Sequence, residues 1–100
     1  MTAVVHVVLV QWGRPPGEAA AEAERLVDRH LGRVEGVTDV ARGASISTEG
    51  LESGLDWGLV VRFASEQALS DYLPDPDHRV VAEHLRAHAE RIVVFDLRHP

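Results

Sequence analysis

The chain of 100 residues contains no cysteine, and all ten of its basic residues are arginine, so lysine is absent as well. The absence of cysteine excludes disulfide bonds, thiolate nucleophiles and metal sites built on sulfur. The absence of lysine excludes Schiff-base catalysis, a covalently bound pyridoxal cofactor and the lysine of a phosphate-binding loop. Any chemistry must therefore come from histidine, carboxylates, tyrosine, hydroxyl groups or a bound cofactor.

Clusters of positive charge and long apolar runs are also missing. The net charge is −6 and the arginines are scattered, so nucleic acid and anionic membranes find no complementary surface. The apolar run near the N-terminus is about ten residues long, too short to span a bilayer, and it lacks the pattern of a signal peptide. We therefore expect a cytoplasmic protein without nucleic-acid or membrane partners.

What is present fits one soluble domain over residues 1–100, with 45% apolar and 26% charged residues. Hydrophobic periodicity and capping residues predict strand 3–12, helix 16–34, strand 37–46, strand 55–63, helix 65–73, a helix beginning at Pro76 and strand 91–98. The order β-α-β-β-α-α-β predicts a ferredoxin-like α+β sandwich with helices on one face of a four-stranded sheet. Because the first strand is apolar on both faces, we expect a homodimer in which two sheets pack face to face.

Four polar side chains interrupt the apolar pattern. Tyr72 and His78 stand six residues apart on the buried faces of two successive helices, joined by a turn at Pro74. His6 is the ionisable residue of the first strand, and Asp96 is a carboxylate in the apolar row of the last strand. We expect His78 and Asp96 to meet beneath the helices, with one ring nitrogen on the carboxylate and the other open to a cavity. Each of these residues also has a purely structural interpretation, because buried polar groups require partners.

The remaining histidines are interpreted as structural. His84 and His88 have the i, i+4 spacing of a helical metal pair, but the glutamate of a zinc-protease motif and a third ligand are missing. We expect them to lie on a solvated helix flank and expect no metal site. His30 lies on the apolar stripe of the first helix.

Several stretches together resemble the stress-responsive dimeric α/β-barrel (Dabb) family. They are His6-Val7-Val8-Leu9, Gly36-Val37, Phe63-Ala64-Ser65-Glu66-Gln67-Ala68-Leu69, Tyr72-Leu73-Pro74-Asp75-Pro76-Asp77-His78 and Val93-Val94-Phe95-Asp96. The resemblance covers nearly the whole chain in order, and the Tyr-x-x-x-Pro-x-His stretch is its most specific part. It implies a small dimeric barrel without a bound cofactor.

Members similar to olivetolic acid cyclase close a linear poly-β-keto thioester by an aldol step. The resemblance implies that His78 is the base, that Asp96 orients it, that Tyr72 contacts the carbonyl end and that His6 lines the pocket. Trp57 stands where those cyclases have histidine, and Val27 stands where they have tyrosine. Both changes make the expected cavity drier and alter its shape.

These observations leave three functional hypotheses. The first is a cofactor-independent cyclase, or a related lyase or isomerase, acting on a polyketide-like β-dicarbonyl, with Trp57, Val27 and Leu59 as the apolar wall. The second is a non-catalytic stress-type dimer that binds a small apolar ligand. The third is a cofactor-free monooxygenase in which Trp57 lines the site.

Overall fold

The computed structural model describes residues 2–14 and 17–100. Its elements are β1 (Ala3–Trp12), α1 (Ala19–His30), the short 3₁₀ helix η1 (Leu31–Arg33), β2 (Val37–Ala44), β3 (Trp57–Phe63), α2 (Glu66–Tyr72), α3 (Pro76–His88) and β4 (Ala89–His99). The element order is the one that the sequence predicts. The predicted helix start at Pro16 lies outside the described residues.

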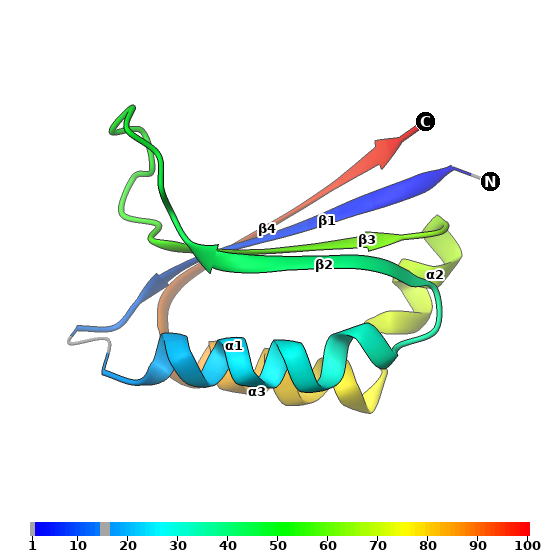
Figure 1. Cartoon of the computed structure of the whole chain (residues 1–100), viewed down its shortest axis with the longest axis horizontal. Helices are drawn as coiled ribbons and strands as arrows, with labels where there is room; N and C mark the ends of the chain where they lie inside the picture. The colour runs from blue at the N-terminus through cyan, green and yellow to red at the C-terminus, as the bar shows by residue number, and fades with distance from the viewer. Residues whose placement is uncertain (1, 15–16) are drawn as a thin grey trace.

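The strands form one antiparallel sheet in the order β2-β3-β1-β4. The helices α1 and α3 lie side by side beneath one face of this sheet, and α2 closes one end of the layer (Figure 1). The ferredoxin-like α+β fold class is thereby confirmed. The strands β1 and β4 diverge from the helical layer toward the start of β1 and the end of β4 (Figure 1).

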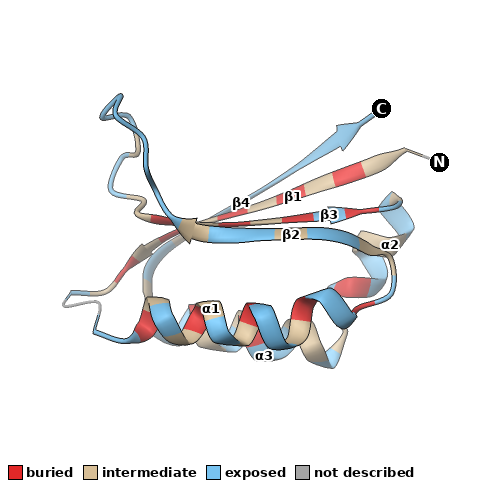
Figure 2. Ribbon diagram, in the orientation of Figure 1, coloured by how far each residue is buried: buried red, intermediate tan, exposed pale blue. Residues whose placement is uncertain are grey.

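The core lies between the sheet and the helices. Along β1 the residues alternate strictly between buried and half-buried, as a strand with one covered face requires (Figure 2). Val4, His6 and Val10 belong to the buried set, and the odd-numbered residues face the other way. His6 is the buried polar residue of this layer among the residues that the structure describes.

Side-chain caps fix the starts of α2 and α3. The Ser65 hydroxyl accepts a hydrogen bond from the Ala68 amide at 3.1 Å, and the Asp75 carboxylate accepts one from the Asp77 amide at 2.8 Å. Pro76 occupies the first turn of α3, where its missing N–H leaves nothing unsatisfied. Tyr72 ends α2 and His78 lies in the first turn of α3, so the capped helices fix the position of the phenol relative to the imidazole.

The outer face of the sheet carries apolar side chains that no helix covers. On β4, Val93 is 37% exposed, Phe95 59% and Leu97 49% (Figure 2). None of the helices within residues 2–14 and 17–100 combines the length and the apolar character that crossing a membrane would need.

Candidate functional site

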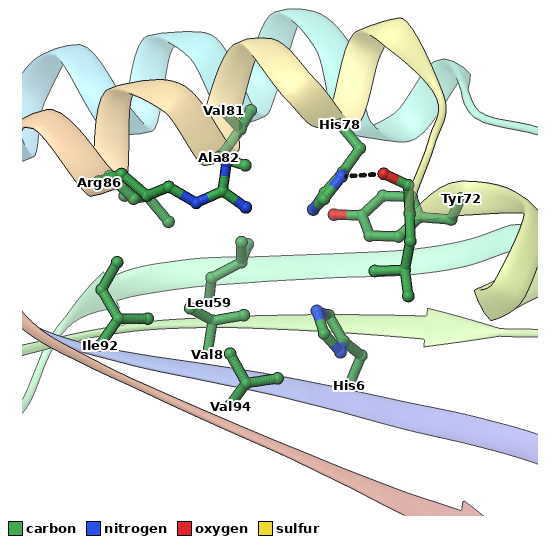
Figure 3. Close-up of a pocket in the computed structure, with 12 residues that line it drawn as sticks. His6, Val8, Leu59, Tyr72, His78, Val81, Ala82, Arg86, Ile92 and Val94 are labelled. Carbon is green, nitrogen blue, oxygen red and sulfur yellow. Dashed lines mark hydrogen bonds between the residues drawn. The ribbon is translucent and has the colours of Figure 1, made fainter.

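A cavity of about 320 Å³ lies between α3 and the inner faces of β1, β3 and β4. Its walls are mainly apolar, and Leu59, Val81 and Ile92 belong to them (Figure 3). Polar groups enter from the sheet and the helices: His6 from β1, Tyr72 from the end of α2, and His78 and Arg86 from α3. A mostly apolar hollow with a few converging polar groups is typical of a small-molecule site.

His78 presents one free ring nitrogen to this cavity. Its Nδ1 lies 2.8 Å from the Leu73 carbonyl oxygen, and because a carbonyl only accepts, Nδ1 must carry the proton (Figure 3). Burial lowers the pKa of His78 below its ordinary value, His6 and Arg86 lower it further, and the Leu73 hydrogen bond opposes them. The neutral ring therefore has its lone pair on Nε2, the atom that a general base needs.

Asp96 binds His6, which corrects the expected pairing of His78 with Asp96. The Nδ1 atom of His6 lies 2.5 Å from Oδ1 of Asp96, and the two residues are register partners on β1 and β4. The expected pairing fails because the C-cap residue of α2 supplies an acceptor for His78, the Leu73 carbonyl. With Nδ1 held by the carboxylate, Nε2 is the His6 ring nitrogen left for the cavity.

Tyr72 packs between the two histidines with its ring buried. Its ring centroid lies 4.4 Å from that of His78, 5.9 Å from that of His6 and 4.8 Å from that of Phe63. The hydroxyl points into the cavity and has no hydrogen-bond partner among residues 2–14 and 17–100 (Figure 3). Burial raises the pKa of Tyr72 well above its ordinary value, and Asp75 raises it further. The phenol thus stays protonated and is available as a donor.

The structure brings Leu59 to this cavity but not Trp57 or Val27. Trp57 donates a hydrogen bond from Nε1 to Glu24 at 3.1 Å, and Val27 is 1% exposed in the core. Both pack where α1 covers the β2–β3 half of the sheet, whereas the cavity lies under α3. Their expected place in the apolar wall is therefore corrected.

Arg86 was not anticipated as a site residue. It follows His78 by eight positions on α3, with Ala82 midway, and this spacing returns to the same helix face. The sequence shows this spacing, but an arginine near a helix end is usually solvated, so the spacing alone does not indicate a site residue.

Three other histidines, His30, His84 and His88, are engaged outside the cavity. His84 donates from Nε2 to the Ala19 carbonyl at 2.8 Å, and His88 donates from Nδ1 to the His84 carbonyl at 2.9 Å. His30 lies 2.7 Å from the Asp77 carboxylate. No group of three or more potential metal ligands occurs within the described part of the chain.

Comparison with known proteins places the chain in a family. A family model for the stress responsive A/B barrel domain matches residues 4–99. A dimeric ferredoxin-like protein of unknown function from Jannaschia sp. CCS1 is similar, with a TM-score of 0.84 and 23% identity over 95% of this chain and 97% of that one. A second such protein, from Thermobifida fusca, has a TM-score of 0.86 and 15% identity over 98% and 92% of the two chains.

A hydroxynitrile lyase from Passiflora edulis has the same fold, with a TM-score of 0.86 and 14% identity over 98% of this chain and 94% of that one. A search of curated proteins gives no match. At these identities the solved structures show the fold alone, whereas the family model spans almost the whole chain. The chain therefore belongs to the stress-responsive A/B barrel (Dabb) family.

Proposed function

We propose that the protein is a cofactor-independent enzyme that removes a proton from a carbon flanked by carbonyl groups, with His78 as the general base. The observation that carries this proposal is the unprotonated Nε2 of His78 at the wall of an apolar cavity, next to the Tyr72 hydroxyl. Carbons between two carbonyl groups are acidic enough for an imidazole to deprotonate when the enolate oxygen is stabilised.

Each polar group has a part in this step. His78 Nε2 takes the proton, and the electron pair of the broken C–H bond moves onto the carbonyl oxygen as an enolate. Tyr72 donates a hydrogen bond to that oxygen. His6 lies beside Tyr72, and its Nε2 can add a second donor only as an imidazolium, because the single proton of the neutral ring lies on Nδ1 facing Asp96. Asp96 acts through His6 by fixing its ring orientation and stabilising its imidazolium when one forms.

The proposed reaction is an aldol-type cyclisation, or a related lyase or isomerase step, on a polyketide-like β-dicarbonyl. In the cyclisation, the enolate carbon attacks a second carbonyl of the same molecule, and His78 returns the proton to the new alkoxide. The mainly apolar walls support a carbon-rich substrate, and about 320 Å³ falls at the lower end of the roughly 300–1,000 Å³ of small-molecule pockets. A hydroxynitrile lyase of the same fold supports the narrower point that this architecture accommodates a lyase.

A non-catalytic dimer that binds an apolar ligand is the second candidate. The His6–Asp96 pair favours it, because each group satisfies the other without any ligand. The oxygenase hypothesis has lost its support, since it depended on Trp57 lining the site and Trp57 lies under α1.

We further propose that the working unit is a homodimer joined through the outer faces of the two sheets. The apolar row Val93, Phe95 and Leu97 on β4 supports this, because such a face is costly to leave in water. Solved structures with this fold are described as dimeric.

The proposal is tested by deuterium incorporation at the carbon between the carbonyl groups of ethyl 2-methylacetoacetate, followed by NMR in heavy water. The protein should accelerate the exchange above the buffer rate, and His78→Ala should remove at least about 100-fold of that acceleration. His84→Ala is the matched control, because His84 lies on the same helix and faces Ala19 instead of the cavity. Exchange that is unaffected by His78→Ala would exclude His78 as the base.

A further inference from the structure

Arg86, although an exposed residue, is the permanently charged side chain in the wall of the cavity. The other lining residues are apolar apart from the two imidazoles and the phenol. The guanidinium lies under Ala82 and is directed along the cavity toward His78 (Figure 3). We propose that Arg86 anchors an anionic end group of the ligand, so that this site takes apolar molecules with a free carboxylate. This inference rests on the proposed function for the location of the ligand and adds its chemical class.

The helix geometry places this anchor at a useful distance from the base. Residues 78, 82 and 86 share one face of α3, and eight residues of helix rise about 12 Å. Side chains on a helix tilt toward its N-terminus, which brings the guanidinium back toward His78. Because position 82 is alanine, no larger side chain separates the two groups. A ligand of modest length can therefore reach Arg86 with its carboxylate while its reactive carbon lies at His78.

The charge of Arg86 lacks an internal partner, whereas five of the ten arginines of this chain are ion-paired. Arg14, Arg25, Arg42, Arg62 and Arg98 all lie within ion-pair distance of a carboxylate. Arg86 forms no ion pair or hydrogen bond with the residues that the structure describes, although acidic residues outnumber basic ones by 16 to 10. A planar guanidinium with free donors at an apolar wall matches the two oxygens of a carboxylate.

The ligand class is tested with a matched pair of probes, 4-phenylbutyrate and its neutral amide, 4-phenylbutyramide. Tyr72 is the single tyrosine of the chain, so ¹³C-labelled tyrosine gives one assigned set of ring signals inside the cavity. Titrations of these signals give the dissociation constant of each probe. The wild-type protein should bind the carboxylate about tenfold or more tightly than the amide, the size of one charge-assisted contact.

Arg86→Gln should reduce this preference to less than about twofold. Arg86→Lys should retain part of it, because lysine keeps the positive charge but lacks the two parallel N–H donors of the guanidinium. Arg79→Gln removes an exposed arginine from the same helix outside the cavity, and it should keep the wild-type preference.

Equal binding of the two probes by the wild-type protein, or a preference that survives Arg86→Gln, would overturn the anchor while leaving the proposed base in place. If neither probe shifts the Tyr72 signals, the anchor and the ligand site both fail. If the preference depends on Arg86 but His78→Ala leaves deuterium exchange unchanged, the anchor stands and the proposed catalysis fails.

Discussion

The Nδ1 atom of His6 lies 2.5 Å from Oδ1 of Asp96, because the antiparallel register of β1 and β4 sets the two residues opposite each other. His6 is buried, whereas nearly half of the Asp96 side chain is exposed, so the carboxylate lies between solvent and the buried ring. His78, on the other side of the cavity, is oriented by a backbone carbonyl instead. The cavity therefore holds two imidazoles whose free nitrogens are set by different partners.

Asp96→Asn should separate orientation of His6 from packing. The amide retains the shape of the carboxylate but neither stabilises an imidazolium nor accepts as strongly, so deuterium exchange should fall about tenfold or more. The free energy of unfolding should fall by about 1 kcal/mol, since one partner is exposed. Asp77→Asn is the control, because it removes the carboxylate of the His30 pair outside the cavity. Equal loss of exchange in the two variants would show that the His6 pair has only a structural role.

Tyr72→Phe removes one hydroxyl and retains the ring. Because that hydroxyl bonds to none of residues 2–14 and 17–100, the melting temperature should change by no more than a few degrees. Loss of an oxyanion donor should lower kcat/KM by about 100-fold. A large fall in melting temperature with unchanged activity would assign Tyr72 to packing alone.

The lowered pKa of His78 predicts a pH dependence of both rate and stability. With increasing pH, the exchange rate should rise as His78 loses its proton, and because its pKa is lower than the ordinary 6.5, the rate should be level at neutral pH. The folded protein binds this proton less readily than the unfolded chain does. The stabilising contribution is therefore complete above about pH 6.5 and is lost as the pH falls toward the folded-state value. Urea unfolding of wild type and His78→Gln at several pH values should show this loss in the wild type relative to the variant, and the opposite sign would contradict it.

Phe95→Glu tests the proposed dimer. A charge in the middle of the exposed apolar row of β4 should convert the dimer to a monomer in light scattering, because a carboxylate in an apolar interface has no partner there. Glu90→Gln, at the start of the same strand, changes one charge outside that row and should leave the dimer intact. A wild-type protein that is monomeric at micromolar concentration would rule out the proposed assembly.

Local sequence signals were sufficient for the fold and for the direction of several side chains. A valine-rich run that is apolar on both faces identified β1, His6 shares its phase with the buried Val4 and Val10, and Ser65 and Asp75 marked the helix starts. The partner of Asp96 depends on the register of β4 against β1, strands separated by the whole chain, and no local pattern encodes that register.

The positions of the wall residues also depend on long-range packing. Trp57 and Val27 have the periodicity of core residues, but the half of the sandwich that they occupy is decided by where α1 and α3 settle on the sheet. Arg86 was overlooked because it is exposed, as hydrophobic periodicity predicts for an arginine, and periodicity cannot show where a long side chain ends.

His78 can act as the base only if it is neutral at pH 7, carries its proton on Nδ1 and offers Nε2 to the cavity. Long-range ¹H–¹⁵N NMR of histidine-labelled protein measures tautomer and titration together, and His78→Gln assigns the signal. We predict an Nδ1–H tautomer with a pKa below 6.5 whose Nε2 signal shifts when 4-phenylbutyrate is added. An Nε2–H tautomer, a pKa above 6.5 or an Nε2 signal indifferent to the ligand would contradict the account.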